Sequence, residues 1–142
     1  MAQEMKYVLD NADIRFAVVE NQEQTDKLLE IRDDCPKLET IIYEDTRGMN
    51  AYQQEFLHCF ADVQQAGKEF DQQNKDFFET SIAQVSNSDT SIILYTSGTT
   101  GVPKGVVLSQ DNLIQASRSS ADFDHLSSDE EVLAYLPVSY TH

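Results

Sequence analysis

Hydrophobic positions in the first third of the chain predict a helix followed by a strand, a second helix and a second strand. Apolar residues recur at helical spacing over residues 2–10. Residues 14–20 and 38–43 form compact apolar runs, and residues 22–32 between them carry apolar positions at helical spacing. Pro36 is expected to end the second helix. Strand, helix and strand with short connections predict a βαβ unit with parallel strands and a right-handed crossover.

The pattern after residue 60 predicts further helices and two more strands. Helical spacing recurs over residues 62–70 and again after a polar linker at 72–74. The continuous apolar run at 91–95 predicts a buried strand, and the run at 132–136 predicts a last one. We therefore expect an α/β fold that is part of a larger domain, with flanking helices and core strands at 14–19, 38–42 and 91–95.

Apolar residues in the predicted helices are expected to face a core. After a short strand at 106–108, Ser109 is expected to cap a helix over residues 110–122 whose inward positions are Leu113, Ile114 and Ala116. Aromatic residues at helical spacing are more typical of a core than of an acyl-chain pocket, and we interpret four phenylalanines in this way: Phe56, Phe60, Phe77 and Phe78. His58 and His125 lack partner residues in the sequence and are assigned no chemistry.

The chain is strongly acidic, and this excludes some classes of partner. Its 142 residues include 10 basic and 25 acidic ones, which gives a formal net charge of −15. A surface of this charge repels the phosphates of nucleic acids and disfavours electrostatic docking on anionic lipid. We expect no nucleic-acid partner and attribute the acidity to solubility.

The cysteines and the apolar runs indicate a cytoplasmic protein. Cys35 and Cys59 lack the spacing of a redox pair or of a zinc site, so we expect free thiols in a reducing compartment and no metal ligands. No apolar run approaches the length of a membrane span, and residues 1–4 lack the plan of a signal peptide.

Residues 96–105, T-S-G-T-T-G-V-P-K-G, predict a loop that binds phosphate groups. The glycines allow backbone turns through positive φ and the approach of an anion to main-chain N–H groups: Gly98, Gly101 and Gly105. Four hydroxyl side chains add hydrogen-bond donors: Thr96, Ser97, Thr99 and Thr100. Lys104 adds a mobile positive charge suited to phosphate.

This loop differs from the P-loop of nucleotide hydrolases and kinases. Lys104 is followed by Gly105, where a P-loop has the Ser or Thr that holds Mg²⁺, and an apolar strand follows where a P-loop needs a helix. The differences argue against a nucleotide hydrolase or kinase. A non-catalytic nucleotide- or ligand-binding module stays open as an alternative, although the particular order of residues 96–105 argues against it.

The order Y-T-S-G-T-T-G-V-P-K-G-V at residues 95–106 is that of the adenylate-forming enzymes, and the chain resembles an acyl-CoA synthetase of the long-chain, AMP-dependent branch. The likeness extends over about residues 4–137, including 15–20, 28–36 and 130–137. It implies activation of a fatty acid with ATP and Mg²⁺ to an acyl-adenylate, then transfer to coenzyme A. It is also compatible with peripheral membrane contact by the full enzyme.

The resemblance also implies which residues bind phosphate. We expect contacts from Ser97, Thr99 and Thr100, backbone approach at Gly98 and Gly101, and contributions from Thr96 and Lys104. The other adenylation motifs, the Mg²⁺-associated pair and the catalytic lysine of the family would follow His142. We therefore expect no catalytic residue within this chain, and no activity from it alone.

The last five residues depart from the family pattern. Residues 1–137 are interpreted as part of an AMP-binding domain, whereas Val-Ser-Tyr-Thr-His at 138–142 replaces the expected continuation. The sequence GTC-TCT-TAT-ACA-CAT of a transposase mosaic-end adapter encodes these five residues. We therefore expect read-through into a sequencing adapter, with a natural variant terminus as the open alternative.

Overall fold

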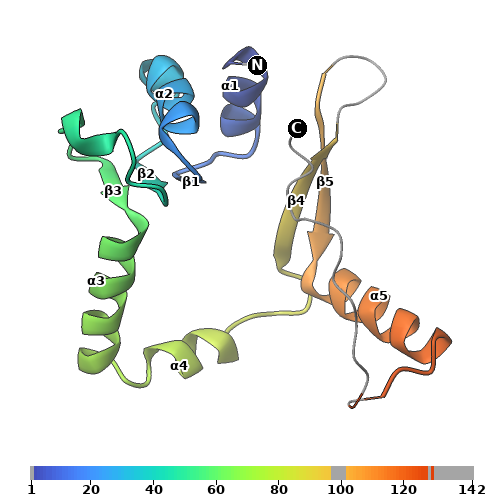
Figure 1. The fold of residues 1–142 in the computed structure, drawn as a ribbon. Coiled ribbons are helices and arrows are strands. Elements are labelled where there is room, and N and C mark those ends of the chain that lie inside the picture. Colours follow the sequence, from blue (N-terminus) through green and yellow to red (C-terminus); the bar gives the residue numbers. More distant parts are fainter. Residues whose placement is uncertain (1, 97–101, 128, 130–142) are drawn as a thin grey trace.

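The fold consists of two sheets joined by helices. The structure, a computed structural model, describes residues 2–96, 102–127 and 129. Figure 1 shows a first sheet beside α1 (Ala2–Asn11) and α2 (Gln22–Ile31), and a separate β-hairpin on the other side of the molecule. Two helices, α3 (Phe60–Gln73) and α4 (Phe77–Ala83), connect them. The prediction of an α/β fold is confirmed.

The first sheet is parallel, as the βαβ pattern predicted. It has the order β1 (Phe16–Val19), β2 (Thr40–Tyr43), β3 (Leu57–Cys59), and both pairings are parallel. The register places Ala17 opposite Ile41 and Ile41 opposite Leu57, so these three side chains share one face.

Short turns separate these elements. Helix α2 is followed by the 3₁₀ turn η1 (Arg32–Asp34), and η2 (Met49–Ala51) lies between β2 and β3. The helix thus ends before Pro36, with one tight turn between them. Asn21 caps α2 by accepting a hydrogen bond from the backbone N–H of Gln24.

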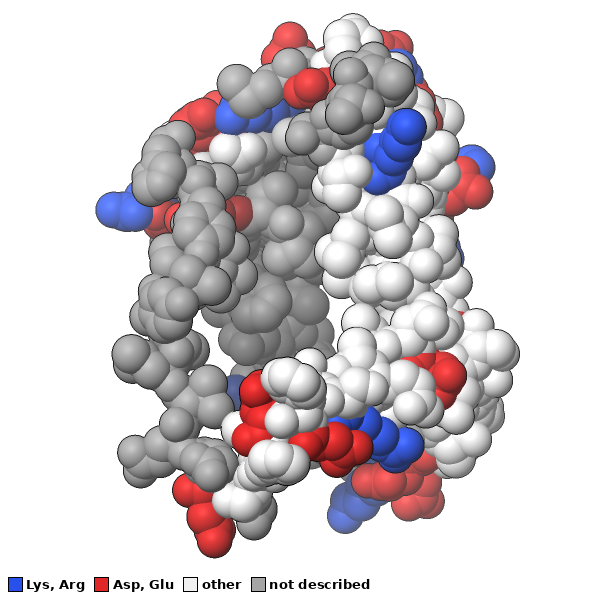
Figure 2. Space-filling model, turned by 90° about the vertical axis from the view of Figure 1, so that its right-hand side faces the viewer, with Lys and Arg blue, Asp and Glu red and all other residues white. Residues whose placement is uncertain are grey.

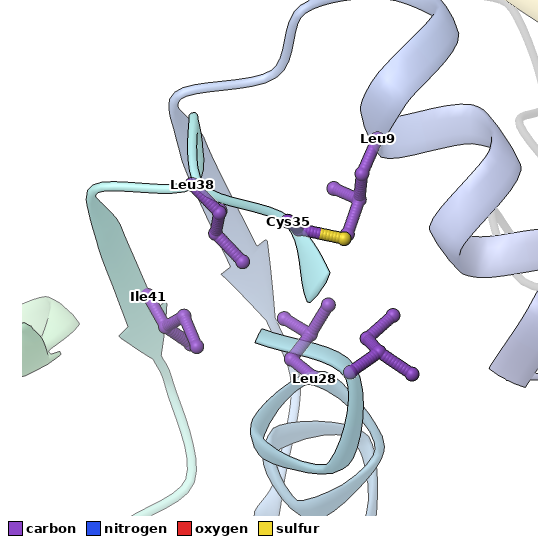
Figure 3. Packing of buried hydrophobic residues seen from close by; sticks show 6 residues of the cluster. Leu9, Leu28, Cys35, Leu38 and Ile41 are labelled. Atoms are coloured by element: carbon purple, nitrogen blue, oxygen red, sulfur yellow. The ribbon is translucent and has the colours of Figure 1, made fainter. Parts of the chain in front are cut away.

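The hydrophobic core lies between this sheet and helices α1 and α2 (Figure 3). Ile41 and Leu38 are almost completely buried, with 0 and 1 % of their surface exposed. Four further buried residues complete the cluster: Leu9, Leu28, Ile31 and Cys35. Burying one such aliphatic side chain stabilises the fold by about 1.5 to 3 kcal/mol. Burial also raises the pKa of the Cys35 thiol, so this cysteine is held in its neutral form.

The opposite face of the parallel sheet is open. Phe16 and Val18 alternate with the inward Ala17 and Val19, and they are 56 and 65 % exposed. Helices α1 and α2 therefore cover one face of a parallel sheet, a class in which both faces are ordinarily covered.

Helices α3 and α4 form a connection with exposed aromatic residues. Helix α3 extends to Gln73, so the linker expected at 72–74 is reduced to Asn74 and the turn before α4. Phe70 and Phe77 pack edge to face across this turn, with ring centroids 5.0 Å apart. Phe60, Phe77 and Phe78 are 38 to 63 % exposed, so interpreting them as core residues was wrong. The fourth, Phe56, does pack against the core cluster.

The second sheet is an antiparallel hairpin of β4 (Thr90–Thr96) and β5 (Lys104–Ser109). The expectation that β4 is a buried core strand was wrong, because Ile92, Ile93 and Leu94 are 38 to 46 % exposed. Among the described strands it pairs with β5 alone, so it is not part of the parallel sheet.

Helix α5 (Gln110–Phe123) follows the hairpin directly. Its N-terminus is capped by Ser109, which accepts from the N–H of Asn112 while the Asn112 side chain accepts from the N–H of Ser109, so the predicted cap is confirmed. The inward positions were wrong: Leu113 and Ile114 are each 38 % exposed, and Ala116 is also exposed. The strand expected at 132–136 and the last five residues lie outside the described residues.

Candidate functional site

The predicted phosphate loop begins and ends in the two strands of the hairpin. Thr96 is the last residue of β4, Lys104 is the first of β5, and the two are paired in the antiparallel register. Both are exposed to solvent. The structure thus brings together the two ends of the predicted site. Ser97, Gly98, Thr99, Thr100 and Gly101 lie outside the described residues, so their phosphate contacts stay a prediction.

The base of the loop has room for glycine alone at position 105. Gly105 pairs with Tyr95, and a Cβ atom there would lie 3.2 Å from Cζ of the Tyr95 ring. The same Cβ would lie 2.9 Å from Cγ2 of Ile93, which is closer than carbon atoms ordinarily approach. The glycine that follows Lys104 therefore leaves room for the Tyr95 ring and the Ile93 side chain.

A hydrogen bond connects the base of the loop to helix α1. The Tyr95 hydroxyl donates to Oδ1 of Asn11, the last residue of α1, at 2.5 Å. The two residues are separated by 84 positions in the sequence. Nothing in the periodicity of the chain predicted this contact, because a polar residue at the end of a helix carries no signal about its partner.

A small cavity lies between α1 and the two residues that precede Lys104. Its volume is about 180 Å³, and its lining residues are Gln3, Glu4, Tyr7, Val102 and Pro103. Val102 and Pro103 directly precede Lys104. The N-terminal turns of α1 therefore lie near Val102 and Pro103, which precede β5. Its last residue, Asn11, contacts Tyr95 in β4.

The Lys104 side chain is exposed, and it has no acidic partner among the described residues. Five other basic residues form ion pairs there: Lys6, Arg15, Lys27, Lys37 and Arg47. Arg47 lowers the pKa of Asp45 through its side-chain hydrogen bond, and Arg15 lowers the pKa of Glu39 in the same way. No ion pair to Lys104 occurs among the described residues, so its charge is not neutralised by them.

A larger cavity lies at the carboxyl ends of β1 and β2, the edge where open parallel sheets ordinarily bind ligands. It has a volume of about 350 Å³ and is lined by Val18, Val19, Glu20, Glu44 and Phe60. Its two carboxylates would repel a phosphate group. Sequence reasoning missed this cavity, although the order of strands in a βαβ unit indicates such an edge.

The described residues do not provide a metal centre or a membrane span. No three His, Cys, Asp or Glu side chains come together as possible metal ligands in residues 2–96, 102–127 and 129. Over the same residues, no helix combines the length and the apolar character needed to cross a bilayer.

Comparisons with known proteins agree in family and fold. The sequence model of the AMP-binding enzyme family matches residues 1–142. Long-chain-fatty-acid–CoA ligase ACSBG2 of Xenopus laevis is 34 % identical over 98 % of this chain and 19 % of its own length, and the human ACSBG2 is 33 % identical over 98 and 20 %. The chain thus spans about a fifth of these relatives.

A solved structure shows the same fold. The anthranilate CoA ligase AuaEII, determined in complex with anthranoyl-AMP, aligns with 82 % of this chain and 20 % of its own at a TM-score of 0.55. Its sequence identity of 22 % supports the fold and no more.

Proposed function

Because the chain belongs to the AMP-binding enzyme family, we propose that it is a segment of a ligase that activates a fatty acid with ATP and transfers the acyl group to coenzyme A. One observation carries the proposal: the hairpin holds Thr96 and Lys104 side by side at the two ends of the glycine- and hydroxyl-rich loop. Similarity to fatty-acid ligases supports the choice of substrate. Residues 1–137 would be part of the adenylation domain, with 138–142 as an adapter-encoded tail.

The chemistry explains why such a loop is needed. A fatty-acid carboxylate is a poor electrophile, so its oxygen first attacks the α-phosphorus of ATP, and the bond to the β-phosphate breaks to release pyrophosphate. The thiol of coenzyme A then attacks the acyl carbon, and AMP leaves. Negative charge develops on the departing pyrophosphate, where hydroxyl groups, backbone N–H groups and a lysine stabilise it if they are already in position.

The hairpin supplies that positioning at the ends of the loop. Ordering a free backbone residue costs about 1 to 2 kcal/mol, while one hydrogen bond to a charged group returns about 1.5 to 3 kcal/mol. Pairing Thr96 with Lys104 fixes both ends of the loop before any ligand arrives. Binding at these two residues then costs less conformational entropy, and more of the contact energy is available for the reaction.

ATP, Mg²⁺ and coenzyme A belong to the proposal as co-substrates and metal. The described residues do not fit a Mg²⁺ site, since no cluster of three ligating side chains occurs among them. We therefore assign no step and no ligand for Mg²⁺ to this chain. Cytoplasmic location and the absence of a nucleic-acid partner are further parts of the proposal, supported by two cysteines without a disulfide and by the net charge of −15.

The test separates the two half-reactions in a ligase of the relatives' length that contains this segment. Thr99→Ala and Thr100→Ala should each slow acyl-adenylate formation by on the order of 10² to 10³, because a donor to the developing charge is lost. Transfer from supplied acyl-adenylate to coenzyme A should be nearly unchanged. Thr90→Ala, at the far end of β4, is the matched control and should leave both half-reactions intact.

If both half-reactions fell equally in the loop variants, the loop would act through structure, and its assignment to pyrophosphate departure would be wrong. If nucleotide bound without any adenylate forming in the unmodified protein, the alternative of a non-catalytic binding module would replace the ligase.

A further inference from the structure

One face of helix α1 follows the hairpin along both sides of the phosphate loop. Gln3, Tyr7 and Asn11 are spaced four residues apart and so lie on the same face of the helix. Asn11 accepts the hydrogen bond from Tyr95, and Gln3 and Tyr7 line the cavity beside Val102 and Pro103. In Figure 1, α1 lies between the parallel sheet and the hairpin. Helix α1 thus contacts the hairpin near both ends of the loop, in addition to the connection through α3 and α4.

From this contact we infer that Asn11 is a positioning residue for the phosphate loop, acting through Tyr95; the inference rests on the proposed function. Tyr95 directly precedes Thr96, and its ring lies 3.2 Å from the Cβ position of Gly105, which directly follows Lys104. The ring of the residue before Thr96 therefore lies beside the residue after Lys104. The hydrogen bond from its hydroxyl to Asn11 fixes where that ring lies.

Helix α1 is suited to this task because it is anchored in the core. Leu9, two residues before Asn11, is 7 % exposed and packs in the hydrophobic cluster. Lys6 donates to the backbone oxygen of Asp34 at 2.7 Å, which ties the same helix to the turn after α2. The hairpin itself contributes no buried residue among those described. Asn11 thus holds Tyr95 in place through a helix that is packed in the core.

The consequence is a change in the population of hairpin arrangements at Thr96 and Lys104. A ligand that binds one arrangement of the hairpin binds more weakly in proportion to the fraction of molecules that lack this arrangement. Removing either partner of the Asn11–Tyr95 bond should therefore weaken phosphate binding without removing any atom that contacts phosphate. The expected loss is about two- to ten-fold, the range contributed by a single hydrogen bond between neutral groups.

The experiment titrates the 142-residue chain with inorganic pyrophosphate at physiological ionic strength, with amide chemical shifts followed by NMR. Asn11→Ala, Tyr95→Phe and the double variant should each lose affinity to the same extent, because all three lack the same bond. Asn11→Asp keeps an oxygen acceptor and should restore affinity to near that of the unmodified chain, since salt screens its added charge.

Tyr52→Phe is the matched control, because the Tyr52 hydroxyl also donates to a side-chain oxygen at 2.5 Å, on Asp26, remote in sequence from the loop. It should leave pyrophosphate affinity unchanged. Equal affinity of all variants would overturn the positioning role of Asn11 and leave the loop assignment standing. An equal loss in Tyr52→Phe would also overturn it, because the effect would then be general destabilisation. If the unmodified chain bound no pyrophosphate at all, the proposed function of the loop would fail, and the inference with it.

Discussion

The parallel sheet with α1 and α2 holds the buried residues of this chain, whereas the hairpin with α5 holds the predicted chemistry. All buried residues in the described part of the chain lie between Leu9 and Met49. The predicted phosphate loop extends from Thr96 to Lys104, where no described residue is buried. Stability in proteins is often divided in this way, with ligand-binding loops drawn from the least stable segments. The comparison teaches that the site depends on a scaffold remote from it in sequence.

The physical origin of the difference is coverage by helices. Helices α1 and α2 pack on one face of the parallel sheet, whereas the apolar residues of the hairpin remain open to solvent. Figure 2 views the molecule from the side of the hairpin and α5. Among the residues that it does not draw in grey, uncharged side chains fill the middle and most charged ones lie toward the top and bottom. Large exposed apolar surfaces of this kind mark contact sites or promote aggregation.

The largest effect is expected from removing the same side chain in each region. Ile41→Ala should destabilise the parallel sheet by roughly 2 to 5 kcal/mol, because Ile41 is completely buried and its loss leaves a cavity. Ile93→Ala, at a position 38 % exposed in β4, should cost about 1 kcal/mol. Residue-resolved hydrogen exchange measures each region separately. Equal losses would show that the two regions unfold as one unit, and the comparison would fail.

An intermediate effect is expected from adding a methyl group to a glycine. Gly105→Ala should destabilise the hairpin by roughly 1 to 3 kcal/mol, because the new Cβ would lie 2.9 Å from the Ile93 side chain. Gly67→Ala is the matched control, since no atom lies within 4 Å of its Cβ position, and it should stabilise helix α3 by about 1 kcal/mol. Circular dichroism during urea unfolding reports the difference. An unchanged hairpin stability in Gly105→Ala would show that the Ile93 and Tyr95 side chains do not lie against this glycine.

The smallest effect is expected from the surface ion pair between Arg15 and Glu39. The hydrogen bond from Arg15 lowers the pKa of Glu39 below its ordinary value. A lowered carboxyl pKa stabilises the fold above the unfolded pKa, and this contribution is lost as pH falls through the folded pKa. Glu39→Gln should therefore be slightly less stable than the unmodified chain at pH 7, and equal to it at an acid pH below the folded pKa of Glu39.

Urea unfolding at the two pH values measures this difference, and Glu55→Gln, at an exposed position outside the observed ion pairs, controls for the loss of one acidic charge. A Glu39→Gln deficit that persisted at the lower pH would mean that the carboxylate charge is not the cause.

Sequence periodicity predicted the elements of the first region well, because the spacing of apolar residues and the order of elements are both local features of the sequence. Apolar spacing and a strand–helix–strand order sufficed for α1, β1, α2 and β2, and the cap at Ser109 predicted the start of α5. Strand β3 was missed because it is only three residues long and has a polar residue, His58, at its centre. A pattern this short does not distinguish a strand from the beginning of a helix.

Burial in the second region could not be predicted, because periodicity shows which face of an element is apolar and not whether another element covers it. This explains the errors at β4, at Leu113 and Ile114, and at three of the four phenylalanines. The ends of the loop were predicted from an ordered motif of ten residues. Asn11 was not, since its partner lies 84 positions away and neither residue forms part of a pattern with the other.

Titration of the 142-residue chain with MgATP, followed by amide NMR, tests most directly whether the hairpin region binds phosphate. We predict shift changes confined to residues 96–105 and weak affinity in the millimolar range, about −4 kcal/mol. The affinity is weak because the net charge of −15 repels ATP and because binding costs conformational entropy. Changes centred on Glu20 and Glu44, at the carboxyl edge of the parallel sheet, would contradict this account, and micromolar affinity would show a self-sufficient nucleotide site.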